Sequence, residues 1–156
     1  MPPPGLDAAL AVQRPIPLYE TARNLGPEVT RAPHLVSEHF RGRVAIGAAI
    51  SEADYKAALV ERSRLVEAVR GWAAACDAIL IPPAPGEAPG LETTGDPRLC
   101  ARWTLVGAPA ISVPAGRGPG GVPLGLQLCA APGEDRSPAR PPGWSERWRQ
   151  TADSPD

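Results

Sequence analysis

The side chains that could bind a metal or act as redox groups are few and widely spaced. The two histidines, His34 and His39, have no acidic or cysteine companions at metal-ligand spacing. We therefore expect each to be solvated or hydrogen-bonded, and we predict no metal site and no cofactor. The three cysteines, Cys76, Cys100 and Cys129, form neither a Cys-x-x-Cys motif nor a disulfide framework, so we expect small buried thiols.

The sequence also offers few residues that could act as a nucleophile or as a base. Lys56 is the only lysine, and it falls on the charged face of a predicted helix beside Glu52. A lysine acts as a base only when it is neutral, which requires a buried setting. Ser112 lies in a predicted strand before Pro114, with no histidine or lysine partner and no strand-turn-helix elbow. We expect Ser112 to be a packed strand residue, and we predict no catalytic residue in this chain.

The elements that would position these groups are organised around Gly107–Cys129. Two apolar runs, Ala110–Val113 and Leu124–Cys129, flank a segment rich in glycine and proline. Short apolar runs bounded by Gly and Pro favour buried strands, and such a connector can bend sharply. The stretch therefore predicts a hairpin or two closely adjacent strands.

A long helix is predicted over Ser51–Cys76. Ser51 suits the N-cap, and Asp54 three residues later gives a start that resembles a capping box. Apolar residues recur at helical spacing along one face, at Tyr55, Leu59, Leu65, Val66, Val69, Trp72 and Cys76. This pattern is typical of a packing helix with a solvated charged face.

The remaining elements are shorter. The pattern predicts a helix over Leu18–Leu25 stopped by Gly26 and Pro27, a buried strand over Ala78–Ile81 and a Pro/Gly-rich loop over 82–95. A second helix is predicted with Asp96 as its cap, Pro97 at its first position, Arg98–Val106 as its interior and Gly107 as its end. This order of helices and strands indicates an α/β fold with a mixed or parallel sheet and flanking helices.

Charge and hydropathy exclude several classes of partner. The formal net charge is −1 and the sequence pI is about 6.1, so no basic face favours nucleic acid or an anionic membrane. No apolar run approaches the roughly 18 residues of a membrane span, and no signal peptide is recognisable. We expect a cytoplasmic protein.

Three regions follow from composition. Residues 1–17 are predicted to be an irregular lead, residues 18–135 a domain, and residues 136–156 a disordered tail rich in proline. The helical pattern is lost abruptly after Asp135, which suggests a frameshifted or degraded end.

Several sequence words together resemble the C-terminal part of an amidase signature enzyme. The matching segments cover about Leu18 to Asp135. The first three are LYETARNLG, Gly-x-x-Ile-Ser-x-x-Asp-Tyr-x-x-Ala and Cys-Asp-Ala-Ile-Leu-Ile-Pro. They are followed by Thr-Gly-Asp-Pro, by Trp-Thr, and by the stretch Gly107–Leu128, which contains Ser-Val-Pro-Ala-Gly and Gly-x-Pro-x-Gly-x-Gln-Leu. The resemblance implies an incomplete α/β/α fold and chemistry at a carboxamide. Because Met1 falls inside the family domain, the chain looks truncated at its N-terminus.

The resemblance also sets expectations for the site. The family uses a serine nucleophile, a second serine in a cis peptide and a lysine base, and these elements lie upstream of the segment that this chain resembles. The family's pocket implies a substrate-binding role for Gly95, Asp96 and Trp103. The structural alternative, with Asp96 as a helix cap and Trp103 as a core aromatic, stays open.

Three functions therefore remain. The favoured one is an amidase-family protein that is inactive as this chain alone. The second is the C-terminal half of a split amidase, completed by a separate N-terminal amidase chain. The third is a non-catalytic binding or scaffold remnant that self-associates through an open sheet edge.

Overall fold

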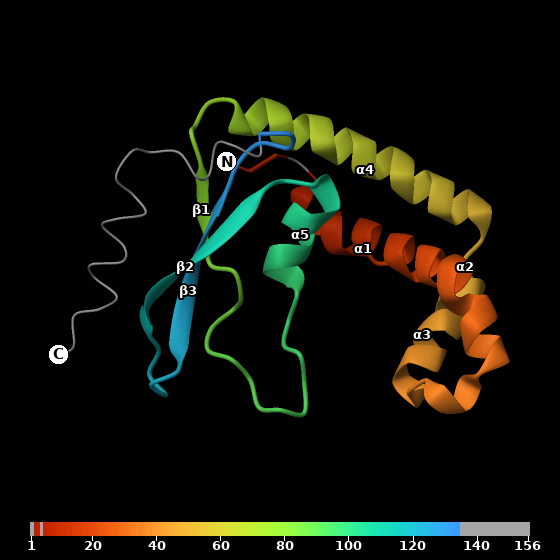
Figure 1. Ribbon diagram of the computed structural model, residues 1–156. Helices are drawn as coiled ribbons and strands as arrows, with labels where there is room; N and C mark the ends of the chain where they lie inside the picture. The colour runs from red at the N-terminus through yellow and green to blue at the C-terminus, as the bar shows by residue number, and fades with distance from the viewer. Residues whose placement is uncertain (1, 4, 135–156) are drawn as a thin grey trace. The chain divides into compact units, whose positions relative to one another are not determined.

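The computed structural model describes residues 2, 3 and 5–134 of the 156-residue chain. The predicted disordered tail, 136–156, lies outside the described residues. The chain divides into two compact units, Pro4–Leu65 and a second unit that contains residues 2 and 3 together with the chain from Val66 onward. Helix α4 (Glu52–Ala73) belongs partly to each (Figure 1).

The first unit is helical. It contains the 3₁₀ turn η1 (Leu6–Ala8), α1 (Ala9–Gln13), α2 (Pro15–Arg31), the 3₁₀ turn η2 (Pro33–Leu35), α3 (Glu38–Ala48) and the beginning of α4. Residues 5–17 are thus largely helical, and the expected irregular lead is wrong there. Helical periodicity was weak in this stretch because only Leu6, Ala9 and Ile16 of its side chains are buried hydrophobics of the core.

Helix α2 also runs through the predicted stop at Gly26 and Pro27, which is a correction to the expected end at Leu25. Pro27 removes one backbone donor from the ladder, but the helix surface from Arg23 to Leu25 is exposed, so water can satisfy the freed carbonyl. The Thr30 hydroxyl donates to the carbonyl of Gly26 (2.9 Å), which satisfies another acceptor in this turn.

Helices α2 and α3 form an antiparallel pair that the sequence did not reveal. Ser37 caps α3 by accepting a hydrogen bond from the backbone N–H of Phe40 (3.3 Å). Near the end of α3, Gly47 lies against the backbone of Leu18, where a Cβ atom would stand only 2.0 Å from the carbonyl oxygen. The absence of a side chain at Gly47 is therefore what allows the two helices to approach.

The start of α4 agrees with its prediction. The Ser51 hydroxyl accepts from the backbone N–H of Asp54 (3.1 Å) and donates to Oδ2 of Asp54 (2.6 Å). Tyr55 stacks on Tyr19 of α2 with ring centroids 4.3 Å apart, and its hydroxyl donates to Oε1 of Glu20 (2.8 Å). That hydrogen bond raises the pKa of Tyr55. The helix ends at Ala73, three residues before the predicted end at Cys76.

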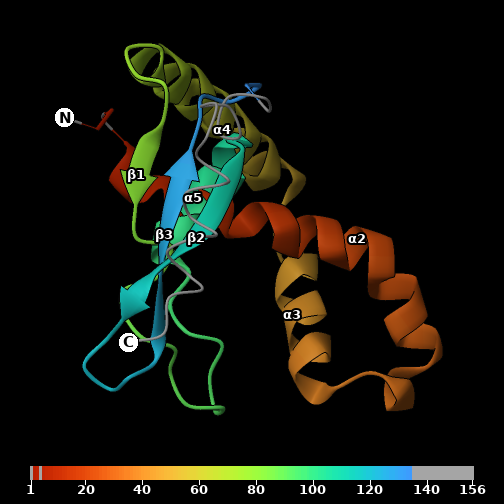
Figure 2. The same ribbon diagram turned by 60° about the vertical axis from the view of Figure 1, so that its left-hand side comes forward.

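Among the described residues, the second unit holds the C-terminal part of α4, a small sheet and α5 (Figures 1 and 2). Its strands are β1 (Ile79–Ile81), β2 (Ala110–Arg117) and β3 (Pro123–Cys129), in the order β1-β3-β2, and α5 spans Arg98–Val106. The predicted hairpin is confirmed as β2–β3. All described strands pair antiparallel, so the expected parallel pairing is absent among them. A connection of five residues between β2 and β3 can only join antiparallel neighbours.

The register places apolar side chains in a row on one face of the sheet. Leu80 pairs with Leu128, which pairs with Ile111, and directly opposed residues share a face. Leu80 is 57% exposed and Ile111 is 40% exposed. Both strands were predicted to be buried, and this face corrects that expectation for the described residues. We call the row formed by Leu80, Leu128 and Ile111 the apolar row.

The free edge of β2 is interrupted by a proline. Ala130 donates to the carbonyl of Pro109 (3.0 Å), so by the alternation of an antiparallel ladder the backbone groups of Ala110, Ser112 and Pro114 turn away from β3. Among the described strands none pairs with this edge. Pro114 places its missing N–H there, as is usual for an edge strand.

The core of the second unit gathers around Cys129, which is fully buried at the end of β3. Its buried neighbours in sequence are Leu128 and Ala130, and α5 contributes Trp103, Leu105 and Val106 to the buried hydrophobics. The expectation of three buried thiols holds for Cys129 only, because Cys76 is exposed and Cys100 is half-buried. Cys76 lies three residues beyond the end of α4 at Ala73.

We predict that Gly47→Ala destabilises the chain strongly. The new methyl group would meet the Leu18 carbonyl group, which belongs to a helix backbone and cannot move aside. We expect the free energy of unfolding to fall by about 3 kcal/mol in urea titrations. The matched control is Gly42→Ala in the same helix, where a Cβ meets nothing within 4 Å and the higher helix propensity of alanine should add about 0.5–1 kcal/mol. Equal effects of the two changes would contradict this packing.

We also predict a pH dependence that arises from Cys129. Burial raises the pKa of its thiol from 9.0 to about 12. The folded state therefore keeps a proton that the unfolded state loses, and stability is fully present below about pH 9 and falls as the pH rises toward 12, with a limiting slope of about 1.4 kcal/mol per pH unit. Urea titrations between pH 8 and 11 should show this loss in the wild type and not in Cys129→Ala. Parallel pH profiles of the two proteins would refute the assignment.

Candidate functional site

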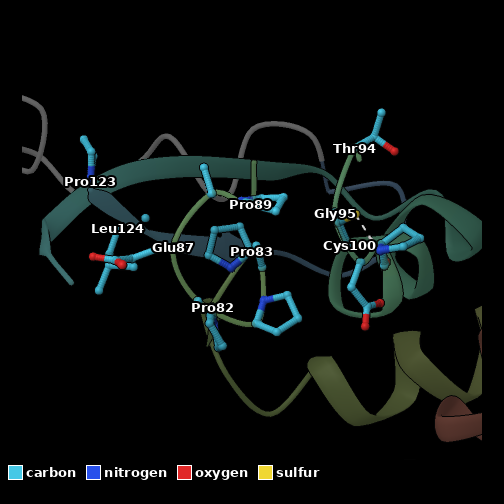
Figure 3. A pocket seen from close by; sticks show the side chains of 16 residues that line it. Pro82, Pro83, Glu87, Pro89, Thr94, Gly95, Cys100, Pro123 and Leu124 are labelled. Carbon is cyan, nitrogen blue, oxygen red and sulfur yellow. Dashed lines mark hydrogen bonds between the residues drawn. The ribbon is translucent and has the colours of Figure 1, made fainter. Parts of the chain in front are cut away.

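A proline-rich loop, residues 82–97, forms one wall of a pocket in the second unit. The loop leaves β1 at Pro82 and ends where α5 begins. The pocket has a volume of about 960 Å³, within the range of small-molecule sites. It is lined by Pro82, Pro83, Ala84, Pro85, Gly86, Glu87, Ala88, Pro89, Thr94, Gly95, Asp96, Pro97, Cys100, Pro123, Leu124 and Gly125 (Figure 3).

Glu87 fastens this loop to the turn of the β2–β3 hairpin. Its Oε1 atom accepts hydrogen bonds from the backbone N–H groups of Gly120 (2.8 Å) and Val122 (3.2 Å). The approach is close enough that a Cβ atom on Gly118 would stand 2.3 Å from the same oxygen. A side chain at Gly118 would therefore have to displace the carboxylate that lies over this turn. We call this contact the Glu87 latch.

The far end of the loop is shaped by Gly95 and Asp96. Gly95 has φ +82°, a left-handed conformation that favours glycine, and its N–H donates to the Thr93 hydroxyl (3.2 Å). Asp96 accepts from the backbone N–H of Arg98 through Oδ1 (2.9 Å) and pairs with the Arg98 guanidinium through Oδ2. The hydrogen bond from the Arg98 side chain holds the pKa of the Asp96 carboxyl below its ordinary value.

The predicted start of α5 is one residue too early, because the N-cap is Pro97, without a side-chain cap bond, and the helix begins at Arg98. Asp96 still accepts from the N–H of Arg98, one of the free donors of the first turn. Helix α5 ends as expected at Gly107, which has φ 66°. The strand end of the pocket depends on another glycine, Gly125, because a Cβ atom there would stand 3.1 Å from Cγ of Pro83. The Pro83 ring can therefore lie directly against β3.

The structure brings two of the three predicted site residues together. Gly95 and Asp96 line the pocket, whereas Trp103 does not. Trp103 is 3% exposed within the core, and its Nε1 atom has no hydrogen-bond partner among the described residues. The sequence missed Glu87, which is one of three acidic residues in the loop, with Glu92 and Asp96, and has no signal that sets it apart. Its partners lie more than 30 residues away, so no local pattern could identify them.

Residues that could hold a metal do not converge. In the part of the chain that the structure describes, no group of three or more His, Cys, Asp or Glu side chains comes together. His34 and His39 are both exposed, as the sequence predicts. Within residues 2, 3 and 5–134, no helix is long and apolar enough to cross a membrane.

Comparison with known proteins agrees with the sequence words and the fold. The family model described as Amidase matches residues 21–137. The A subunit of the glutamyl-tRNA(Gln) amidotransferase of Cereibacter sphaeroides strain ATCC 17029 is 37% identical over 123 residues, which cover 69% of this chain and 25% of that protein. The protein of the same name from Rubrobacter xylanophilus is 39% identical over 114 residues, covering 68% and 22%. This chain belongs to the amidase family.

A solved structure supports the same assignment. A crystal structure described as an amidase superposes with a TM-score of 0.77 at 31% identity, covering 92% of this chain and 36% of the other. The chain therefore spans about a quarter of the curated relatives and about a third of this solved structure. The predicted fold class, a part of the amidase fold with helices around a sheet, is confirmed.

We predict that Gly118→Ala weakens the Glu87 latch. The added methyl group must displace the Glu87 side chain, so the amide hydrogens of Gly120 and Val122 should lose protection in hydrogen-exchange measurements. We expect a cost of about 1 kcal/mol in the wild type, comparable to one net hydrogen bond.

The control for this effect is Glu87→Ala, which removes the carboxylate. In that background Gly118→Ala should cost less than about 0.5 kcal/mol, because the clash no longer exists. If the glycine change costs the same in both backgrounds, its effect arises from the turn itself and the latch is refuted.

Proposed function

We propose that this chain is part of an enzyme that cleaves or transfers a carboxamide, and that it supplies one wall of the substrate pocket. The nucleophile and the base of the reaction come from polypeptide outside these 156 residues. Membership of the amidase family supports the reaction class. The pocket that contains Gly95 and Asp96 supports the substrate-binding role that the sequence predicts for them.

The observation that carries the proposal is the state of Lys56. Its Nζ atom forms an ion pair with Oε1 of Glu52 (2.7 Å), and both side chains are mostly exposed. The hydrogen bond to Glu52 raises the pKa of Lys56, so the amine is held in its charged form. A charged ammonium cannot accept a proton, and Lys56 therefore does not meet the requirement for a base.

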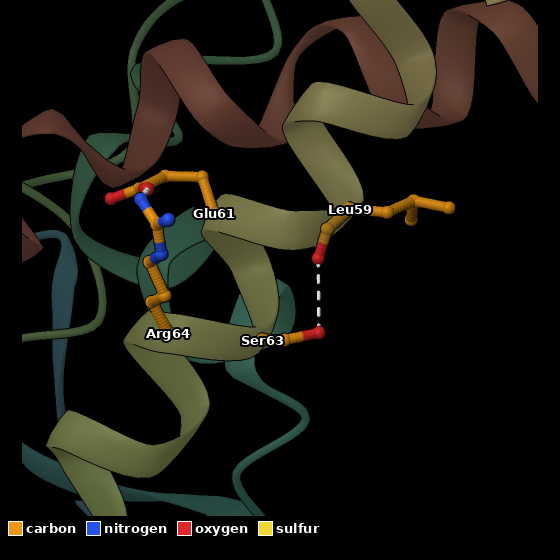
Figure 4. Close-up of polar contacts among 4 residues, drawn as sticks. All are labelled: Leu59, Glu61, Ser63 and Arg64. Atoms are coloured by element: carbon orange, nitrogen blue, oxygen red, sulfur yellow. Dashed lines mark hydrogen bonds and ion pairs between the residues drawn. The ribbon is translucent and has the colours of Figure 1, made fainter.

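Three of the four described serine hydroxyls are engaged in local structure. Ser37 and Ser51 cap helices, and Ser63 donates to the carbonyl of Leu59 within α4 (3.0 Å; Figure 4). The charged neighbours Glu61 and Arg64 pair with one another at 3.3 Å. Ser112 lies exposed on β2. Within the described residues, none of these four hydroxyls bonds to a histidine or lysine that could activate it as a nucleophile.

A partner polypeptide forms part of the proposal. The apolar row leaves Leu80 and Ile111 exposed, and large apolar side chains on a sheet face are usually covered. The relatives are named as one subunit of an amidotransferase, which supports a function in an assembly. We propose an N-terminal amidase chain as the partner. Self-association through the open edge of β2, in a binding or scaffold remnant, is the alternative.

We predict that the purified chain alone releases no ammonia from a panel of carboxamides, and that Lys56→Met and Ser112→Ala behave like the wild type. Mixing the chain with the part of the Rubrobacter xylanophilus protein outside its matched region should restore ammonia release, because that part supplies the missing groups. Turnover by the chain alone that is lost in Lys56→Met would overturn the proposal. An inactive mixture together with a monomeric, cooperatively unfolding chain would favour the scaffold alternative.

A further inference from the structure

We propose that the pocket beside the proline-rich loop takes an uncharged group with an aromatic ring and discriminates against anionic ligands. This inference rests on the proposed function only in naming that group as the acyl part of a carboxamide. The binding preference itself is a property of this chain and can be measured without any catalysis.

The wall of the pocket is built mainly from proline rings. Pro82, Pro83 and Pro89 gather around its centre, and Leu124 closes it at the start of β3 (Figure 3). Proline rings present rigid C–H faces that carry slight positive charge, and the face of an aromatic ring carries negative charge. Proline-rich segments dock on aromatic grooves through contacts of this kind. In this pocket the protein supplies the proline rings and the ligand supplies the aromatic ring.

The polar side chains of the wall are mostly occupied by bonds within the chain. The carboxylate of Asp96 accepts hydrogen bonds from the backbone N–H and the guanidinium of Arg98. The Cys100 thiol donates to the Pro97 carbonyl (3.3 Å). Glu87 gives one oxygen to the two N–H groups of the hairpin turn. The Thr94 hydroxyl lies at the rim, away from the proline rings (Figure 3). A ligand in the centre therefore meets apolar surface.

The wall of the pocket carries a negative charge that no cationic side chain among the described residues neutralises. Asp96 is balanced by Arg98, whereas Glu87 pairs with no cationic side chain among the described residues. Two backbone N–H groups bond to one of its oxygens without cancelling its net charge. A carboxylate entering the pocket meets this charge as repulsion, and an uncharged carboxamide does not.

The test uses the 156-residue chain with benzamide and benzoate as probes, which share a ring and differ in charge. Titrations are followed through the backbone amide resonances of the loop and of Gly125. We expect benzamide to shift these resonances, and benzoate to bind at least about fivefold more weakly, as expected for one like charge across a pocket open to water. Equal binding of the two probes, or no shift with benzamide at tens of millimolar, would overturn the proposal.

Two variants separate charge from shape. Glu87→Gln keeps an oxygen that can accept from Gly120 and Val122 but removes the charge, so the benzamide-to-benzoate affinity ratio should fall toward one. Pro83→Ala removes a ring and should lower the affinity for benzamide while the ratio stays high. Glu61→Gln, which changes the net charge equally but lies outside the pocket lining, should leave both affinities unchanged.

These results are independent of the proposed enzymatic function. Selective benzamide binding together with failure of the mixing experiment would retain the pocket and refute the enzyme. Restored ammonia release with no preference between the probes would retain the enzyme and refute the ligand class. An unchanged ratio in Glu87→Gln also overturns the role of its charge.

Discussion

A single carboxylate oxygen joins two segments of the second unit that are more than 30 residues apart. The Glu87 latch binds the proline-rich loop to the hairpin turn, and without it the loop would have few attachments along its length. The latch also explains the composition of the turn, because Gly118 and Gly120 leave room for a side chain that arrives from elsewhere. The pocket is thus a product of long-range pairing between one acid and two backbone donors.

The sequence predicted those elements whose signals are local. Ser51 with Asp54 marks the start of α4, Gly107 marks the end of α5, and the glycine-rich connector marks the hairpin. Predictions failed where a distant contact decides the outcome. Helix α3 packs against α2 through the approach of Gly47 to Leu18. Its short length and its two glycines give no sequence signal for that contact.

The site shows the same division. Gly95 and Asp96 were identified from a motif, and Asp96 bonds locally to the backbone N–H of Arg98, although the N-cap itself is Pro97. Glu87 was invisible because its partners come from a different part of the chain. The apolar composition of the strands predicted burial, but within the apolar row only Leu128 is buried, and Leu80 and Ile111 are exposed among the described residues.

Pro114 limits the backbone hydrogen bonding that the open edge of β2 can offer to another strand. An incoming strand finds both the donor and the acceptor of Ala110 and Ser112, but at Pro114 it finds a carbonyl without an N–H. Beyond that residue the register shifts before Arg117, so the regular ladder stops. A second copy pairing with this edge would therefore find a regular ladder only along the first part of the eight-residue strand. Pro114 thus limits ordered stacking of copies on the strand that carries the exposed Ile111.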